Sequence, residues 1–192
     1  MKRVTLVVLL ILNFSMLFAQ EEPKEGGKLL SADKLFVGGS LEFGFGSNTL
    51  VGLTPQFGYR LSPKLEAGLG LNGQTINGNG SDMLGDFRIK RRGAGLQVFG
   101  RYFPAPNLVV QLRPEVTYIF GKQKFYQQNQ ETKLDAEIAP ALLAGGGFVL
   151  PAGNRSFMLT ASYDLLQQDH APYGKNPLFS LTYTVRLGQE IR

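Results

Sequence analysis

The single histidine, His170, is the side chain of this sequence best suited to exchange protons near neutral pH. It lies in the segment Asp169-His-Ala-Pro-Tyr173. Nucleophilic catalysis also needs a nucleophile beside the base and a third group that orients the base, and no serine lies near His170 in the sequence. We therefore expect no catalytic residues and no enzyme, and we keep an enzyme that uses His170 as a less favoured alternative.

Ten charged residues stand on the polar sides of segments in which apolar and polar residues alternate. If these side chains are enclosed together, they must be paired and hydrogen-bonded, because an isolated buried charge is very costly. We expect an internal ion-pair network, with a proton- or ion-conducting path as the less favoured interpretation. The ten residues are Glu42, Arg60, Glu66, Arg101, Arg113, Glu115, Asp135, Glu137, Asp164 and Arg186.

A compact basic cluster consists of Arg88, Lys90, Arg91 and Arg92. Guanidinium groups match the geometry of phosphate oxygens well. The cluster therefore predicts a contact with a phosphate-bearing surface, whereas an ordinary solvated face is the alternative interpretation.

Cofactor and metal chemistry find little support in the sequence. The chain has no cysteine, which excludes disulfides and thiolate metal sites. The glycine runs Gly78-Asn-Gly-Ser81 and Gly145–Gly147 lack the following lysine and helix that a phosphate-binding loop needs. We expect no cofactor and no metal.

The elements that position these side chains are strands. From Leu35 to Phe45, every odd position is apolar or glycine, which is the two-residue period of a strand with two unlike faces. The same period recurs along the chain and predicts eight strands. They are Leu35–Gly46, Leu50–Leu61, Leu65–Gln74, Arg91–Phe103, Leu108–Gly121, Lys133–Leu150, Phe157–Leu166 and Leu178–Gly188.

The connections between these strands alternate in length, apart from a short one at Ser47–Thr49. Short turn-like connections are expected at Ser62–Lys64, Pro104–Asn107 and Pro151–Arg155. Longer polar loops are expected at Thr75–Lys90, Lys122–Thr132 and Gln167–Pro177. An even number of strands with short turns at one rim and long loops at the other predicts an all-β fold, an eight-stranded antiparallel up-and-down transmembrane β-barrel.

Two finer predictions concern the strand register. A three-residue turn at Ser62–Lys64 places Leu61 opposite Leu65 and Arg60 opposite Glu66, with both charges pointing inward. The strand interiors also contain three prolines, which lack the amide donor that a strand ladder uses. We expect bulges at Pro55, Pro114 and Pro140.

The N-terminus has the pattern of a secretory signal. Lys2 and Arg3 precede an apolar stretch from Val4 to Phe18, and Ala19 offers a cleavage point. The expected organisation is a signal peptide over 1–19, a flexible segment over 20–34, the barrel over 35–188 and a tail over 189–192. Loss of Lys2 and Arg3 leaves 18 basic against 15 acidic residues, a balance that does not favour nucleic acid as a partner.

A helical membrane protein is excluded, because no later stretch stays apolar for about 18 residues. The rival at the level of the fold is a soluble barrel of the calycin type. That fold would reverse the two faces of each strand, with apolar side chains inside and polar side chains outside.

Three stretches, Gly38–Gly46, Leu53–Gly70 and Val98–Pro104, resemble the small eight-stranded outer-membrane β-barrels, the group that includes the OmpA membrane domain and OmpX. The resemblance covers most of the chain from Leu35 to Gly188. It implies location in the bacterial outer membrane, insertion by the barrel-insertion machinery and contact with lipopolysaccharide. We expect a monomer with a filled lumen and a structural or surface-interaction role. A narrow porin-like channel is the alternative, and a lipid A-modifying enzyme is less favoured.

Overall fold

The computed structural model describes residues 31–46, 48–82, 85–125, 130–168, 172–173 and 176–188. Residues from Ala32 onward belong to one compact unit. The expected signal peptide, most of the segment 20–34, the tail 189–192 and His170 lie outside the described residues. No helix in the described part of the chain is both long enough and apolar enough to cross a bilayer.

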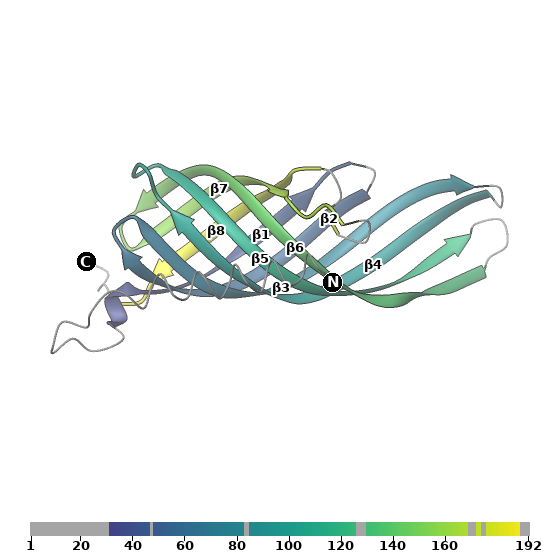
Figure 1. The fold of residues 1–192 in the computed structure, drawn as a ribbon, viewed down its shortest axis with the longest axis horizontal. Coiled ribbons are helices and arrows are strands. Elements are labelled where there is room, and N and C mark those ends of the chain that lie inside the picture. Colours follow the sequence, from purple (N-terminus) through teal and green to yellow (C-terminus); the bar gives the residue numbers. More distant parts are fainter. Residues whose placement is uncertain are drawn as a thin grey trace. The chain divides into compact units, whose positions relative to one another are not determined.

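Eight strands form the fold, preceded by a short 3-10 turn, η2 (Ala32–Lys34). Each strand pairs antiparallel with the next one, and β1 also pairs with β8, so the sheet closes into a barrel (Figure 1). The predicted eight-stranded up-and-down barrel is therefore confirmed. The strands are β1 (Leu35–Gly44), β2 (Asn48–Ser62), β3 (Leu65–Asp82), β4 (Gly85–Tyr102), β5 (Leu108–Phe125), β6 (Gln130–Ala152), β7 (Arg155–Asp164) and β8 (Leu178–Arg186).

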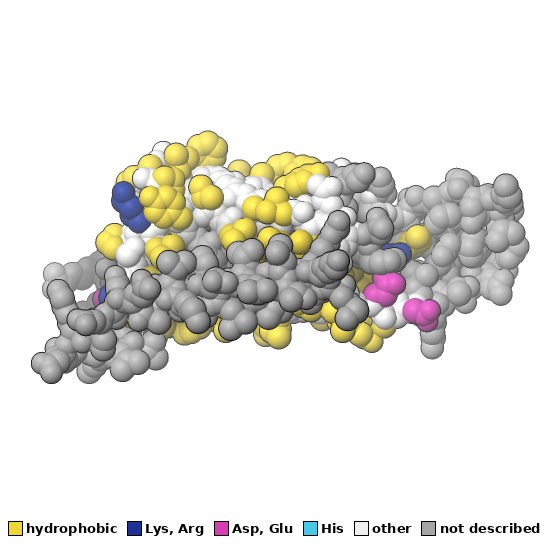
Figure 2. Space-filling view, viewed as in Figure 1, with side chains coloured by type: hydrophobic (Ala, Val, Ile, Leu, Met, Phe, Trp, Pro, Cys, Tyr) yellow, Lys and Arg dark blue, Asp and Glu magenta, His cyan; other side chains and the backbone are white. Residues whose placement is uncertain are grey.

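The two faces of the barrel wall differ in the way that the alternation predicts. Large apolar side chains point outward, with 58% of Leu53 and 70% of Ile138 exposed. Polar neighbours such as Thr54 and Gln56 point inward and are buried. Hydrophobic side chains are spread over the described outer surface of the barrel (Figure 2). This arrangement is the reverse of a soluble barrel, so the calycin-type alternative is wrong.

Two of the three expected long loops are extended hairpins. β3 continues to Asp82 and pairs with β4 from Gly85, and β5 continues to Phe125 and pairs with β6 from Gln130. β4 and β5 also pair as far as Phe87 and Phe125, so β3 to β6 extend together beyond the other strands (Figure 1). The prediction of loops at Thr75–Lys90 and Lys122–Thr132 was wrong. On β6, residues 135–138 are exposed on both faces, so nothing there requires apolar and polar residues to alternate, and the periodicity ends before the strand does.

The register confirms one of the two residue pairs that were predicted beside the turn at Ser62–Lys64. Arg60 is opposite Glu66, as expected, but Ser62 rather than Leu61 is opposite Leu65. The turn therefore contains only Pro63 and Lys64, and the extra residue forms an irregularity at Leu61. A second register shift lies between Ile119 and Gly121.

The bulges predicted at the three prolines were wrong. The register is unchanged on either side of Pro55, Pro114 and Pro140, although the ladder toward β3 lacks pairs at Pro55 and the ladder toward β4 lacks them at Pro114. Pro140 lies on β6 before its pairing with β7 begins at Leu143. The amide and carbonyl of Leu142 point to the β7 side, and so does the nitrogen of Pro140 two residues earlier. This is an edge position, where a missing amide breaks no ladder.

Candidate functional site in the barrel interior

The ion pair expected at the short turn is present. Arg60 donates from Nε and Nη2 to Oε1 of Glu66, at 3.1 and 2.7 Å. Glu66 is buried, whereas about a third of the Arg60 side chain is exposed. This pair joins β2 and β3 at the end of the barrel that carries the short turns, which we call the short-turn end; the opposite end is the loop end.

A second charged group crosses the middle of the lumen. Arg113 on β5 donates from Nη1 to Oε1 of Glu42 on β1 at 2.5 Å, and its Nε lies 3.8 Å from Oε2 of Glu115. All three side chains are at most 3% exposed. Burial of this kind requires pairing, and β1 and β5 supply the partners from opposite sides of the barrel.

Tyr173 completes this group, and the sequence analysis did not single it out. Its hydroxyl donates to Oε1 of Glu115 at 2.5 Å. Tyr173 belongs to the connection between β7 and β8, outside the strands. Burial, followed by the nearby carboxylates of Glu115 and Glu42, raises the pKa of Tyr173 well above its usual range. The hydroxyl therefore keeps the proton that it donates.

Arg101 organises the lumen toward the short-turn end. Its Nη2 donates to Oε1 of Gln56 at 2.5 Å, and the guanidinium stacks 4.2 Å from the centre of the Phe99 ring. Gln56 donates onward to Ser40, which shares a hydrogen bond with Thr182 on β8. We call the buried polar residues of these two groups, together with Ser180, which is opposite Glu42 on β8, the polar layer. It consists of Ser40, Glu42, Gln56, Arg101, Arg113, Glu115, Ser180 and Thr182.

The remaining residues of the predicted network divide into three cases. Asp164 is buried and accepts amide hydrogen bonds from Leu142 and Leu166, so it caps backbone groups. Arg186 is half-buried and donates to the carbonyl of Gly153 at 2.7 Å. Asp135 and Glu137 are exposed, which contradicts their placement in the lumen. They precede Leu143, where β6 first pairs with β7, by eight and six residues, farther than the buried Ala139 and Ala141, and lie where β6 extends beyond the enclosed part of the barrel.

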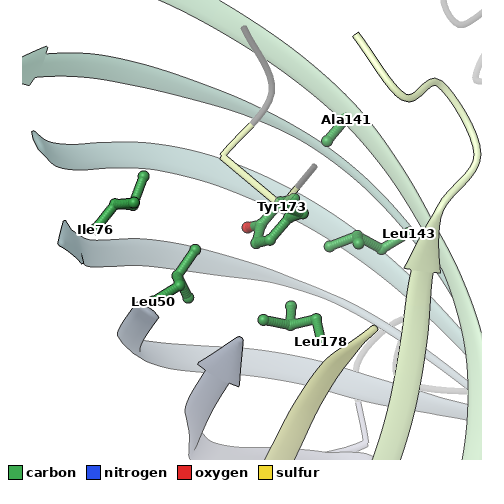
Figure 3. Close-up of a cluster of buried hydrophobic side chains, with 6 residues drawn as sticks. All are labelled: Leu50, Ile76, Ala141, Leu143, Tyr173 and Leu178. Atoms are coloured by element: carbon green, nitrogen blue, oxygen red, sulfur yellow. The ribbon is translucent and has the colours of Figure 1, made fainter. Parts of the chain in front are cut away.

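An apolar layer lies on the loop-end side of the polar layer. The ring of Tyr173 lies among inward-pointing side chains of four strands (Figure 3). Leu50 and Leu178 lie at the loop ends of β2 and β8, and Leu143 lies opposite the last residue of β7. In the sequence, the strand residues of this set could have been found as apolar residues at positions where the alternation points inward. We call this set the loop-end layer: Leu50, Ile76, Ala141, Leu143, Tyr173 and Leu178.

A second apolar set lies at the opposite end. Phe36 and Phe99 are buried with ring centroids 6.2 Å apart, and Val109, Val149 and Met158 form a cluster on the other side of the lumen. Each residue lies within four residues of the short-turn end of its strand. We call these five residues the short-turn layer. Because Phe99 points inward, its ring fills the lumen beside Arg101.

The basic cluster is divided by the strand alternation. Lys90 and Arg92 are exposed on the outer face of β4, in line with Ala94 and Leu96, whereas Arg91 is half-buried on the other face. On β5, the register places Phe120 opposite Arg92 and Lys122 opposite Lys90. Toward the loop end, the outer face of β4 and β5 therefore carries apolar residues first, then an aromatic residue and then basic residues. The register pairs Arg88 with Lys124.

Comparison with known proteins finds similarity in the fold only. Neither the protein-family models nor the curated proteins give a match. Among solved structures, Ail, the attachment invasion locus protein of Yersinia pestis, in complex with the heparin analogue sucrose octasulfate, is 9% identical over 79% of this chain and 94% of its own, with a TM-score of 0.44. Neisserial surface protein A is 11% identical over 81% of this chain and 97% of its own, with a TM-score of 0.46. A de novo designed transmembrane β-barrel is 15% identical, covers 81% of this chain and 97% of its own, and has a TM-score of 0.34.

Proposed function

We propose that this protein is an integral barrel of the bacterial outer membrane with a structural or surface-interaction role and no open channel. The observation that carries the proposal is the orientation of the faces in a closed barrel. Large apolar side chains such as Leu69, Leu96 and Phe148 are exposed all around the wall, while ion pairs lie inside. Exposed apolar area of this extent is unfavourable in water and favourable against acyl chains.

The backbone supports the same location. Closure through the β1–β8 pairing leaves no sheet edge within the barrel, and hydrocarbon tolerates no unpaired backbone amides or carbonyls. The three shortest strands, β1 and β7 with 10 residues each and β8 with 9, match the length of about 9–11 tilted residues that crosses a bilayer. The protein acts as a monomer in this proposal and depends on the barrel-insertion machinery to reach the membrane.

The proposed surface partner is lipopolysaccharide. Arg92 and Lys90 follow the apolar and aromatic outer face toward the loop end, and a barrel embedded by that face would bring them near the phosphates of the lipid head groups. Cationic side chains near such a surface gain about 1 kcal/mol each. Arg88 and Arg91 add positive charge nearby, with Arg91 on the opposite face of β4.

A channel role has less support than a filled lumen. Arg113 bonds to Glu42 across the middle of the lumen, and apolar side chains of the loop-end layer and the short-turn layer fill it toward its two ends. An eight-stranded barrel is also narrow enough for side chains to fill. The enzyme alternative rests on His170, which lies outside the described residues.

Membrane fractionation with a gel-shift assay tests the location. The protein is expected in the outer-membrane fraction and is expected to change its gel mobility when boiled, because the closed barrel resists detergent until heated. Recovery of the mature protein as a detergent-free soluble species would overturn the proposal. In planar bilayers, steady discrete openings would overturn the filled lumen.

The lipid contact has its own experiment. A variant with Lys90→Gln and Arg92→Gln is expected to retain less lipopolysaccharide through purification than the parent protein. Lys64→Gln, in the turn at the opposite end, is the matched control and should retain the parental amount. Equal retention by all three proteins would refute the contact and leave the membrane location untouched.

A further inference from the structure

One row of the outer wall holds small side chains between large ones. The register places Leu53 on β2 opposite Gly73 on β3. Gly73 is also opposite Ala94 on β4, and Ala94 is opposite Tyr118 on β5. All of these positions are exposed. The outer surface is therefore lower at Gly73 and Ala94 than at their large neighbours, and we call this low place the notch.

The notch is open on its outer side. A Cβ at Gly73 would meet no atom closer than the carbonyl oxygen of Leu53, at 3.8 Å, which is an ordinary contact. Glycine inside a strand often lies where another molecule approaches the backbone closely. Leu71 and Leu96, which are opposite each other and exposed, limit the notch toward the short-turn end.

Cationic side chains lie directly beyond the notch. Toward the loop end, Arg92 and then Lys90 follow Ala94 on the outer face of β4. Lys122 on β5 is exposed and opposite Lys90. Within the described ranges, no ion pair engages Arg92 or Lys90. Like charges opposite each other destabilise a sheet, and an anion bound between Lys90 and Lys122 would offset that cost.

Aromatic rings border the notch and the cations on the β5 side. The rings of Tyr118 and Phe120 are tilted, with centroids 6.1 Å apart. Both are exposed, and Phe120 is opposite Arg92. A molecule with an apolar chain in the notch would therefore contact the rings along one side and bring its polar end to Arg92.

We propose that the notch holds one acyl chain of a single lipopolysaccharide molecule, whose phosphates bind Arg92, Lys90 and Lys122. The inference rests on the proposed function and adds a defined binding place to the proposed lipid contact. Lipid A, the membrane-embedded part of lipopolysaccharide, has two phosphates on a disaccharide, whereas a glycerophospholipid has a single phosphate diester. Adjacent cations on two strands match the more highly charged head group, because guanidinium and ammonium groups both form strong charge-assisted hydrogen bonds with phosphate.

Binding of defined lipids to the purified, full-length protein in detergent micelles tests the inference. Native mass spectrometry counts the molecules of synthetic diphosphorylated lipid A on each protein and gives the affinity from a titration. A variant with Gly73→Leu and Ala94→Leu fills the notch without changing the charge. Gly39→Leu on β1 is the matched control, because a Cβ at Gly39 also has open space, 3.7 Å from the carbonyl oxygen of Thr54.

The parent protein is expected to bind lipid A one to one. Filling the notch should weaken this binding about tenfold, because leucine side chains occupy the space of the acyl chain and its van der Waals contacts are lost. Gly39→Leu should bind lipid A like the parent. Phosphatidylglycerol should bind the parent about tenfold more weakly than lipid A, because it lacks the second phosphate.

Two kinds of result would overturn the inference. If the notch-filled variant binds lipid A as tightly as the parent, or if Gly39→Leu weakens binding equally, the notch holds no acyl chain. If phosphatidylglycerol binds as tightly as lipid A, the notch does not select lipopolysaccharide.

The retention experiment with Lys90→Gln and Arg92→Gln tests the phosphate contact separately. Lost retention in that variant, together with unchanged binding in the notch-filled variant, would refute the acyl-chain position and leave the proposed function intact. The gel shift on boiling, measured for every variant, establishes that each one is folded. If the double leucine variant does not fold, Gly73→Leu alone takes its place, with a smaller loss of affinity expected.

Discussion

Arg113 and Glu42 are 71 positions apart in the sequence and 2.5 Å apart across the lumen. They belong to β5 and β1, which lie on opposite sides of an eight-stranded closed sheet. A direct contact between these strands means that the interior is spanned by side chains at this level. The ion pair therefore fixes the barrel cross-section in addition to neutralising two charges.

Breaking this pair should be costly. Arg113→Met leaves the carboxylates of Glu42 and Glu115 buried without their cation, and it is expected to lower the free energy of unfolding by about 3–5 kcal/mol. Glu42→Gln leaves Arg113 with Glu115 alone, 3.8 Å away, and should cost less. The double variant should lose less than the sum of the two, because it removes both members of one interacting pair. Urea titration of the gel-shifted folded fraction in lipid vesicles measures all three variants.

The Arg60–Glu66 pair is the control for that measurement. Its arginine is about one third exposed, so water screens the interaction, and Arg60→Gln should cost about 1 kcal/mol or less. If Arg60→Gln is as damaging as Arg113→Met, burial does not decide the strength of these pairs.

Gly58→Ala should disrupt the short-turn layer. A Cβ at Gly58 would lie 2.3 Å from Cζ of Phe36, and a ring in a packed lumen has little room to move. We expect a loss of about 1–3 kcal/mol of stability. Gly73→Ala is the matched control, because its nearest contact would be 3.8 Å from the carbonyl oxygen of Leu53. Adding Phe36→Leu to Gly58→Ala should recover part of the loss, and no recovery would contradict this explanation.

A charge on the outer face should be tolerated only near a rim. Leu71 is 60% exposed and lies midway along the part of β3 that pairs with β2, and Leu71→Arg should cost about 2–4 kcal/mol in a bilayer. Ser62→Arg, at the short-turn end, should cost about 0–1 kcal/mol. The same variants compared by urea unfolding would show equal costs if this face were in water.

Asp164 should govern the mobility of the backbone around it. Asp164→Ala removes the acceptor of the Leu142 and Leu166 amides, so both should exchange hydrogen faster. Loss of such caps costs about 1 kcal/mol. Amide exchange measured by NMR in micelles reports the two residues individually. Ser156→Ala, which removes a hydrogen bond to Thr184 at the other end, should leave both rates unchanged.

The alternation of apolar and polar residues predicted those parts of the barrel wall whose two faces have different surroundings. Leu53 faces outward and Thr54 inward because the two sides of the wall differ, and that difference appears in the sequence. The Arg60–Glu66 contact followed from the same reasoning, because a turn couples nearby residues. Closure through β1 and β8 followed from the even number of strands.

The remaining features depend on contacts that a local pattern does not contain. Asp135 and Glu137 follow the alternation of β6, but β7 ends before it reaches them, so they are exposed. The turn at Pro63 and Lys64 is one residue shorter than expected, which only the pairing of β2 with β3 reveals. Tyr173 enters the lumen from a connection, where no period indicates which way a side chain points.

The position of Pro140 has a consequence for contacts between copies of the protein. β6 continues past the last residue of β7, and the exposed margin of such a strand can recruit a strand from a neighbouring molecule. The imino nitrogen faces that margin and cannot donate to an incoming chain. An incoming strand would therefore find no amide donor at this position of the margin.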